Sequence, residues 1–95
     1  MFRILVRTAK FTPALAVLLP LAAQAADRAF CAGYADAAME QVHRAITRPT
    51  CVGGARGARW ARERRVHFDW CLGASPAAAA SERRARADFL RGCGG

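Results

Sequence analysis

The sequence predicts an all-α domain, a small three-helix bundle stapled by two disulfides, that follows a cleaved signal peptide. Three observations predict this class. The chain opens with a basic and then apolar leader, its later part holds four cysteines at near-even spacing, and apolar residues there recur at intervals of three and four. The 95 residues suffice for one domain at most.

The leader is interpreted as a signal peptide of residues 1–25. Three basic residues precede an apolar run over residues 11–23, and Ala23-Gln24-Ala25 places small residues at both positions that signal peptidase recognises. A transmembrane anchor is the alternative, but a spanning helix needs about 20 apolar residues, and this run is shorter and contains two prolines. We expect cleavage after Ala25, which leaves residues 26–95 as a periplasmic or secreted domain without a transmembrane segment.

Removal of the leader changes the charge and limits the core. The leader holds three of the 15 basic residues and none of the seven acidic ones, so the mature part has 12 arginines and a net charge of +5. A surplus of this size favours anionic partners or surfaces and says nothing about the fold. A domain of 70 residues has a thin core, and ordering costs about 1.5 kcal/mol per residue. Covalent staples are therefore expected.

Residues 27–48 are predicted to form the first helix, with its apolar residues on one stripe. Asp27 is a suitable N-cap, since its carboxylate can accept hydrogen bonds from the free amides of the first turn. Pro49 ends the helix, because the residue before a proline is displaced from the α region. Residues 49–57 contain three glycines. They are expected to form a flexible connection that lets Cys51 reach its partner.

Residues 58–72 are predicted to form the second helix. At about 100° per residue, Trp60, His67 and Cys71 fall within one narrow stripe. Gly73 is expected to end this helix, because glycine takes the left-handed conformation without a steric penalty.

Residues 76–91 are predicted to form the third helix. Ser75 is its expected cap, followed by a proline in the first turn, and Gly92 is its expected end. Glu82 and Arg86 are four residues apart, a spacing that favours an ion pair on the helix surface. The expected buried side is Ala78, Ala85, Phe89 and Cys93, with Leu90 at its margin.

The positions of the four cysteines predict how they pair. Their spacings of 20, 20 and 22 residues each correspond to one helix and one turn, so in an up–down–up bundle Cys31 and Cys71 share one end and Cys51 and Cys93 the other. A helix of about 16 residues is roughly 24 Å long, whereas a disulfide needs α-carbons within about 7 Å. We expect the bridges Cys31–Cys71 and Cys51–Cys93, since either other pairing would have to span a helix.

The core is expected to draw large side chains from all three helices. At least one tryptophan edge is expected near the surface, because so small a domain cannot enclose every ring. The predicted core residues are Tyr34, Val42, Trp60, His67, Trp70 and Phe89.

Several residues of the mature chain form a recognisable pattern. It runs Cys-x-x-Tyr-Ala, Trp, His-x-x-Trp-Cys and Cys, and it is carried by Cys31, Tyr34, Ala35, Trp60, His67, Trp70, Cys71 and Cys93, with Gln41, Glu82 and Leu90. The pattern resembles short exported proteins of proteobacteria, and the resemblance covers most of the mature chain. It implies export and a cysteine framework but no function, because that group has no assigned activity. Val52 departs from the pattern, which has a glycine beside the second cysteine.

The side chains do not predict an enzyme. Nucleophilic catalysis needs an activated nucleophile with an adjacent base, and the cysteines are expected to form bridges. His67 and Cys71 have metal-ligand spacing, but a bridged cysteine cannot bind a metal as a thiolate. His67 is therefore expected to be a packed residue whose ring nitrogens bond to neighbours. No Cys-x-x-Cys-His motif is present, which excludes covalent haem, and no metal or other cofactor is predicted.

The arginines carry the functional prediction. Arg56, Arg59, Arg62 and Arg65 recur every three residues, and guanidinium groups bind phosphate and carboxylate in a bidentate manner. The predicted function is a non-enzymatic periplasmic binding or accessory protein whose arginine-rich face contacts an anionic envelope surface or an acidic periplasmic protein. Nucleic acid is excluded as a partner by the expected export. The alternative is a periplasmic thiol-redox or metal-binding protein that uses Cys71 and His67.

These expectations predict the covalent state of the purified protein. Its N-terminal residue should be Ala26, and none of its four cysteines should react with a thiol reagent under denaturing conditions. N-terminal sequencing and mass spectrometry check both statements. Four free sulfhydryls, or an uncut leader, would contradict the predicted architecture.

Overall fold

The computed structural model describes residues 25–94, so the predicted signal peptide lies outside the described residues except for Ala25. The described part contains helices and no β-strand, which confirms the all-α class. None of its helices is long and apolar enough to cross a membrane. In chain order the elements are α1 (Arg28–Ile46), α2 (Pro49–Val52), the 3₁₀ helix η3 (Ala58–Trp60), α3 (Arg64–Leu72) and α4 (Pro76–Gly94).

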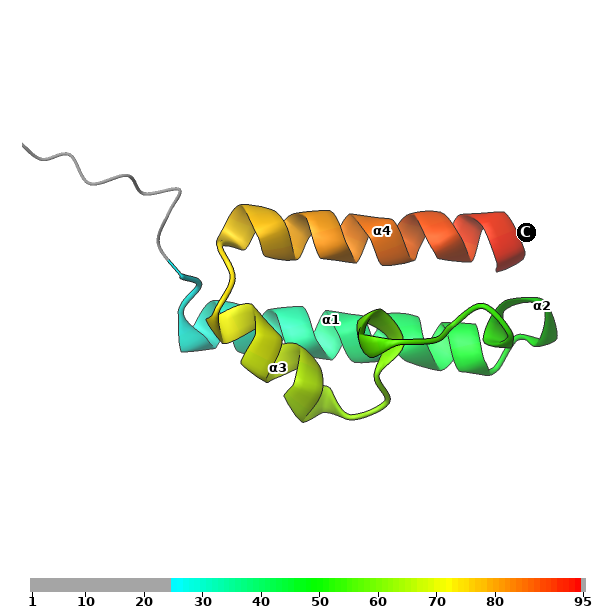
Figure 1. The fold of residues 1–95 in the computed structure, drawn as a ribbon, viewed down its shortest axis with the longest axis horizontal. Helices are drawn as coiled ribbons and strands as arrows, with labels where there is room; N and C mark the ends of the chain where they lie inside the picture. Colours follow the sequence, from blue (N-terminus) through cyan, green and yellow to red (C-terminus); the bar gives the residue numbers. More distant parts are fainter. Residues whose placement is uncertain (1–24, 95) are drawn as a thin grey trace, which may run out of the picture.

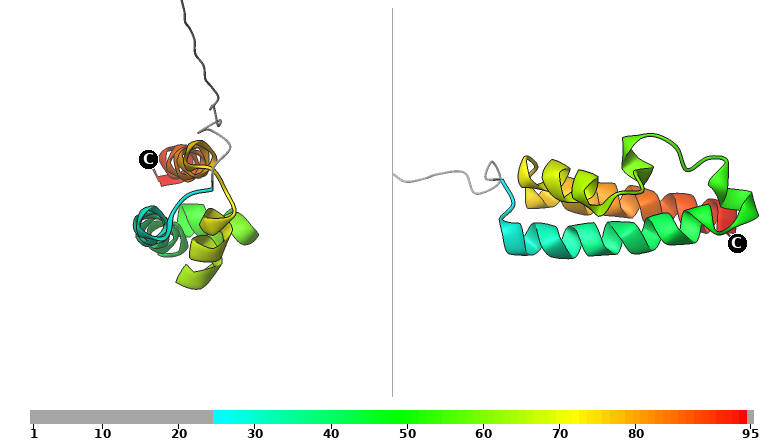
Figure 2. Two further views of the ribbon diagram at one scale, coloured as in Figure 1. Left: turned by 90° about the vertical axis from the view of Figure 1, so that its left-hand side faces the viewer. Right: turned by 90° about the horizontal axis from the view of Figure 1, so that it is seen from below.

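The two long helices, α1 and α4, lie side by side and run in the same direction (Figure 1). The chain returns from the end of α1 to the start of α4 through α2, η3 and α3, and the second and third of these lie on one flank of the α1–α4 pair (Figure 2). The arrangement is the expected up–down–up bundle. Its middle rod, however, is made of short pieces rather than one helix.

Helix α1 begins where the sequence predicts and ends slightly earlier. The Asp27 carboxylate accepts a hydrogen bond from the Phe30 amide at 2.8 Å, which confirms the predicted cap. The helix ends at Ile46, where the Thr47 hydroxyl donates to the His43 carbonyl. Pro49 is the first residue of α2, a position at which a missing amide hydrogen has no consequence. The expected flexible connection over residues 49–57 is therefore wrong in its first half.

The predicted second helix over residues 58–72 is interrupted, and only Arg64–Leu72 is α-helical. A local contact accompanies the interruption. Nε2 of His67 lies 2.7 Å from the Ala61 carbonyl oxygen, so a side chain takes the acceptor that helical backbone would otherwise use. The backbone of Glu63 is extended (φ −115°, ψ 126°). Gly73 follows the last helical residue as predicted, although with a negative φ.

Helix α4 has the predicted cap but a partly different buried side. The Ser75 hydroxyl accepts from the Ala78 amide at 3.0 Å. The helix continues to Gly94, beyond the expected end at residue 91. Its buried residues are Ala79, Arg86 and Leu90. The predicted side is therefore correct only in part, since Phe89 and Cys93 are partly buried against core residues, whereas Ala78 is exposed and the fully buried residues lie one position further along.

Both predicted disulfides are present, one at each end of the bundle. Cys31 and Cys71 have α-carbons 5.5 Å apart, and those of Cys51 and Cys93 are 5.2 Å apart. All four cysteines lie within the described residues, and none has a free thiol.

Each disulfide belongs to a separate apolar cluster. One cluster surrounds Cys51 and consists of Val42, Ala45, Cys51, Ala55, Trp60 and Leu90, with Phe89 packed against it. The other consists of Ala26, Cys31, Tyr34, Cys71 and Ala79. Of the predicted core residues, Trp70 is the one that does not fit, since it is 43% exposed and covers Tyr34 from outside at a ring-centroid distance of 5.6 Å. Its exposure agrees with the expected tryptophan edge at the surface.

Gly54 holds the return segment close to α4. A Cβ at this position would lie 3.0 Å from the Phe89 ring, closer than ordinary van der Waals contact. Phe89 in turn packs against Trp60 at a centroid distance of 4.9 Å. The glycine therefore permits the approach that encloses the cluster around Cys51.

Removal of either disulfide is expected to have a similar effect. The two bridges close loops of nearly equal length, with sequence separations of 40 and 42 residues. Each should contribute about 4 kcal/mol in the chain-entropy model. Urea denaturation of the double variants C31A/C71A and C51A/C93A measures the two losses. A loss below about 1 kcal/mol for either pair would contradict the role assigned to these bridges.

Candidate anion-binding pocket

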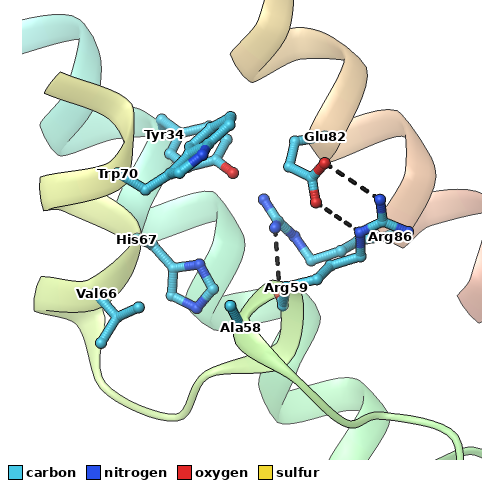
Figure 3. Close-up of a pocket in the computed structure, with 8 residues that line it drawn as sticks. All are labelled: Tyr34, Ala58, Arg59, Val66, His67, Trp70, Glu82 and Arg86. Atoms are coloured by element: carbon cyan, nitrogen blue, oxygen red, sulfur yellow. Dashed lines mark hydrogen bonds and ion pairs between the residues drawn. The ribbon is translucent and has the colours of Figure 1, made fainter. Parts of the chain in front are cut away.

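A cavity of about 240 Å³ lies where α1, η3, α3 and α4 meet. We call it the Arg86 pocket, and Figure 3 shows its side chains. Its residues come from all four elements because the chain is interrupted between η3 and α3. They are Tyr34, Ala58, Arg59, Val66, His67, Trp70, Glu82 and Arg86.

Arg86 is completely buried and extends from α4 into this pocket. Its Nε donates to Oε1 of Gln41 at 2.7 Å, and its Nη1 donates to the Arg59 carbonyl oxygen at 3.3 Å. The guanidinium carbon lies 5.2 Å from the centroid of the Tyr34 ring. Its Nη2 is buried and has no hydrogen-bond partner. Figure 3 shows the guanidinium between Glu82 on one side and the Arg59 backbone on the other.

Within residues 25–94, no carboxylate forms an ion pair with the buried charge of Arg86. Its partners are an amide oxygen, a carbonyl oxygen and an aromatic ring, all of which are neutral. A buried charge without a counter-ion is costly to a folded protein, and an unpaired buried donor adds a further penalty. The arrangement therefore favours an anion at Nη2.

Gln41 positions Arg86 from the opposite helix. Its side chain is 5% exposed, and its Nε2 donates to the Arg83 carbonyl oxygen at 3.0 Å. Because the amide nitrogen is used there, Oε1 faces Arg86 and accepts from its Nε. Gln41 thus orients the guanidinium without neutralising it.

Glu82 and Arg59 form an ion pair in the same pocket. Nε and Nη2 of Arg59 lie 2.5 and 3.2 Å from the two carboxylate oxygens of Glu82, which is a bidentate geometry. The hydrogen bond to Glu82, followed by the charge of that carboxylate, raises the pKa of the Arg59 guanidinium. The expected Glu82–Arg86 pair was wrong, because the interrupted second rod brings Arg59 within reach of Glu82.

His67 lines the pocket as a packed residue. It is 3% exposed. Since the Ala61 carbonyl can only accept, Nε2 of His67 must carry the hydrogen in their 2.7 Å contact. Cys71 is bonded to Cys31. No group of three His, Cys, Asp or Glu side chains in residues 25–94 could hold a metal ion. The alternative thiol or metal function stays an untested prediction.

The remaining wall of the pocket is apolar and partly open. The side chains of Trp70 and Val66 on α3 are 43% and 39% exposed, and both line the pocket with Tyr34 and Ala58. A ligand held by the guanidinium groups could therefore place an apolar group against an indole ring.

Of the four arginines predicted to bind, only Arg59 lines the pocket. Arg56 donates to the Gly53 carbonyl oxygen at 2.8 Å, ahead of η3. Arg62 lies exposed between η3 and α3. On α3, Nε of Arg65 lies 3.5 Å from Oδ2 of Asp69, with which it forms an ion pair. The interruption of the predicted second helix separates Arg59 on η3 from Arg65 on α3, so the structure brings only Arg59 to this pocket, and binding by the other three stays a prediction.

Arg86, the central residue of the pocket, is not among the binding residues that the sequence predicts. A signal was present, since Ala79, Arg86 and Leu90 are spaced by seven and four residues and so lie on one helical stripe. A charged residue within an apolar stripe indicates either an error in the stripe or a functional site.

A wider groove of about 770 Å³ between α1 and α4 also carries arginines. Arg44, Arg83 and Arg84 line it beside Phe30, and all four residues are exposed. The guanidinium groups of these exposed arginines can remain hydrated. The groove therefore lacks the buried, unpartnered donor that distinguishes the Arg86 pocket.

Replacement of Gln41 tests the energetics of the pocket. Gln41→Met removes the acceptor of Arg86 Nε and should lower the free energy of unfolding by about 1–3 kcal/mol, the penalty for an unpaired buried donor. The exposed neighbour variant Glu40→Met is the matched control and should change stability by less than about 0.5 kcal/mol. Equal stability of the two variants in urea would show that Arg86 does not depend on Gln41.

Comparison of the chain with protein-family models, with curated proteins and with solved structures finds no match. The resemblance to short exported proteins stays a prediction. The side chains of the Arg86 pocket are therefore the basis on which a function is assigned.

Proposed function

We propose that the mature chain is a non-enzymatic, exported binding or accessory protein that recognises an anionic group in the Arg86 pocket. The observation that carries this proposal is the completely buried Arg86, which has an unpartnered Nη2 and no carboxylate partner. A bound anion would supply both the missing charge and the missing acceptor.

The size and walls of the pocket suit a small ligand or a single group of a larger partner. Its volume of about 240 Å³ is below the range of about 300–1,000 Å³ that holds drug-sized molecules. Two guanidinium groups provide polar contacts, and the Trp70 ring provides an apolar one. Few polar groups within an otherwise apolar wall are typical of binding sites.

The other arginines support binding from a distance. Arg62 is exposed and forms no ion pair with any residue in 25–94, as is also true of Arg83 and Arg84. An excess of exposed positive charge raises the rate at which anions reach a site. The anion can belong to an envelope surface or to an acidic protein, and the two disulfides are typical of the oxidising compartments in which such partners occur.

Arg86→Met tests this function. In the unaltered protein, benzoate should bind and shift the indole N–H signal of Trp70, which lines the pocket, while leaving that of the buried Trp60 in place. Arg86→Met has a similar volume but no charge, and it should abolish the shift. The NMR titration uses Arg84→Met as the matched control, because this arginine is exposed on the same helix and lies outside the pocket.

Benzoate binding that survives Arg86→Met would overturn the proposed site. Arg86→Lys retains the positive charge but loses the planar fork of donors. This variant provides a second test of the site in case the methionine variant does not fold. It should bind benzoate more weakly than the unaltered protein while both disulfides remain intact.

A further inference from the structure

The charges within the Arg86 pocket are unequal in number. Arg59 and Arg86 contribute two positive charges and Glu82 one negative charge, which leaves one positive charge in excess. Arg59 is matched by Glu82 through two hydrogen bonds. The excess charge therefore belongs to Arg86, whose contacts are all neutral.

From this imbalance we infer that the pocket selects monoanionic carboxylates with a compact apolar group, and that Glu82 is the residue that determines this selection. The inference rests on the proposed function and specifies its ligand. A singly charged ligand neutralises the site, whereas a dianion such as a phosphate or phosphonate leaves a net negative charge beside Glu82 in a poorly solvated cavity. Like charges brought that close repel each other strongly.

The shape of the polar groups favours a carboxylate as well. Arg59 already holds one carboxylate, that of Glu82, in a bidentate arrangement, which shows that the mouth of the pocket accommodates this group. Nη2 of Arg86 offers donors on one edge only, because Nε and Nη1 are bound to Gln41 and to the Arg59 carbonyl. One open edge can serve both oxygens of a carboxylate, whereas it leaves the third oxygen of a phosphonate without a donor from Arg86.

Nη2 is buried in the structure, so a ligand reaches it only if a side chain of the pocket moves. We assign this movement to the Glu82–Arg59 pair, which lines the same pocket and whose Arg59 and Glu82 side chains are 49% and 25% exposed. Ion pairs this open to water contribute little to stability, so their separation is a small barrier. Glu82 thus withdraws from Arg59 when a ligand carboxylate reaches Arg86, and its charge remains at the rim of the pocket afterwards.

The apolar wall defines the rest of the ligand. Val66, Trp70 and Ala58 present carbon atoms around the site of the guanidinium groups. Figure 3 shows Val66 and Trp70 on α3, across the pocket from Glu82 on α4. A ring or short aliphatic chain attached to the carboxylate can therefore contact the indole while the oxygens reach Arg86.

Calorimetric titration of the mature protein with three probes of similar shape tests the selection. The probes are benzoate, neutral benzamide, and phenylphosphonate at a pH at which it is a dianion. The unaltered protein should bind benzoate, and it should bind phenylphosphonate at least about tenfold more weakly, a difference of ~1.4 kcal/mol. Benzamide should not bind. Glu82→Gln should strengthen phenylphosphonate binding by about tenfold and benzoate binding by less.

The control variant is Asp88→Asn, which makes the same change in net charge on the same helix outside the pocket. It should leave all three affinities unchanged, and an effect equal to that of Glu82→Gln would overturn the inference. Phenylphosphonate that binds the unaltered protein as tightly as benzoate does, with both dependent on Arg86, would overturn the selection but leave the proposed function standing. Absence of Arg86-dependent binding by either anion would overturn both.

Discussion

The two disulfides fix both ends of a bundle whose middle is poorly suited to stability. Each bridge lies in its own apolar cluster, one beside Tyr34 and the other beside Trp60. Between them the parallel helices α1 and α4 meet through a polar layer formed by Gln41 and Arg86. Covalent bridges limit the entropy of the unfolded chain, and this stabilisation helps to offset the cost of the buried Arg86 guanidinium. Stability is therefore concentrated at the ends, and the middle is available for chemistry.

The pocket forms beside that polar layer because the predicted second helix, over residues 58–72, is interrupted. A continuous helix over residues 58–72 would have kept the Ala61 carbonyl in backbone hydrogen bonds. In the structure His67 takes this carbonyl, the chain extends through Glu63, and Arg59 turns toward Glu82 on α4. The same interruption allows Trp60 to pack with Phe89 in the apolar cluster around Cys51, while Cys71 remains at the other end. One local hydrogen bond thus serves the fold and the site together.

Much of the architecture followed from the sequence because its causes are local or covalent. The Asp27 and Ser75 caps, the all-α class and both disulfide pairings depend on short-range chemistry or on helix length, and all were predicted correctly. The interruption after Trp60 could not be predicted, since no proline or glycine marks it and the contact that accompanies it joins the His67 side chain to the backbone of Ala61. The buried side of α4 was predicted only in part for a related reason. Arg86 was assumed to be exposed, and only its position between Ala79 and Leu90 indicated otherwise.

The predicted arginine set shows the same limit. A spacing of three residues brings Arg56, Arg59, Arg62 and Arg65 together only if one helix carries them. In the structure four successive segments carry them, namely the loop before η3, η3 itself, the link between η3 and α3, and α3. The net positive charge was counted correctly from the sequence. The arginine on which the proposed site depends, Arg86, is not one of the four that recur every three residues. Buried charges are recognised by their neighbours in space, and those neighbours come from α1 and η3.

A crystal structure of residues 26–95 grown with benzoate tests the central claim most directly, since that claim concerns a single nitrogen atom. The account predicts a carboxylate oxygen within hydrogen-bond distance of Arg86 Nη2, with Glu82 withdrawn from Arg59. Density that instead shows the Glu82 carboxylate or a water molecule bound to Nη2, with no benzoate in the pocket, would contradict it.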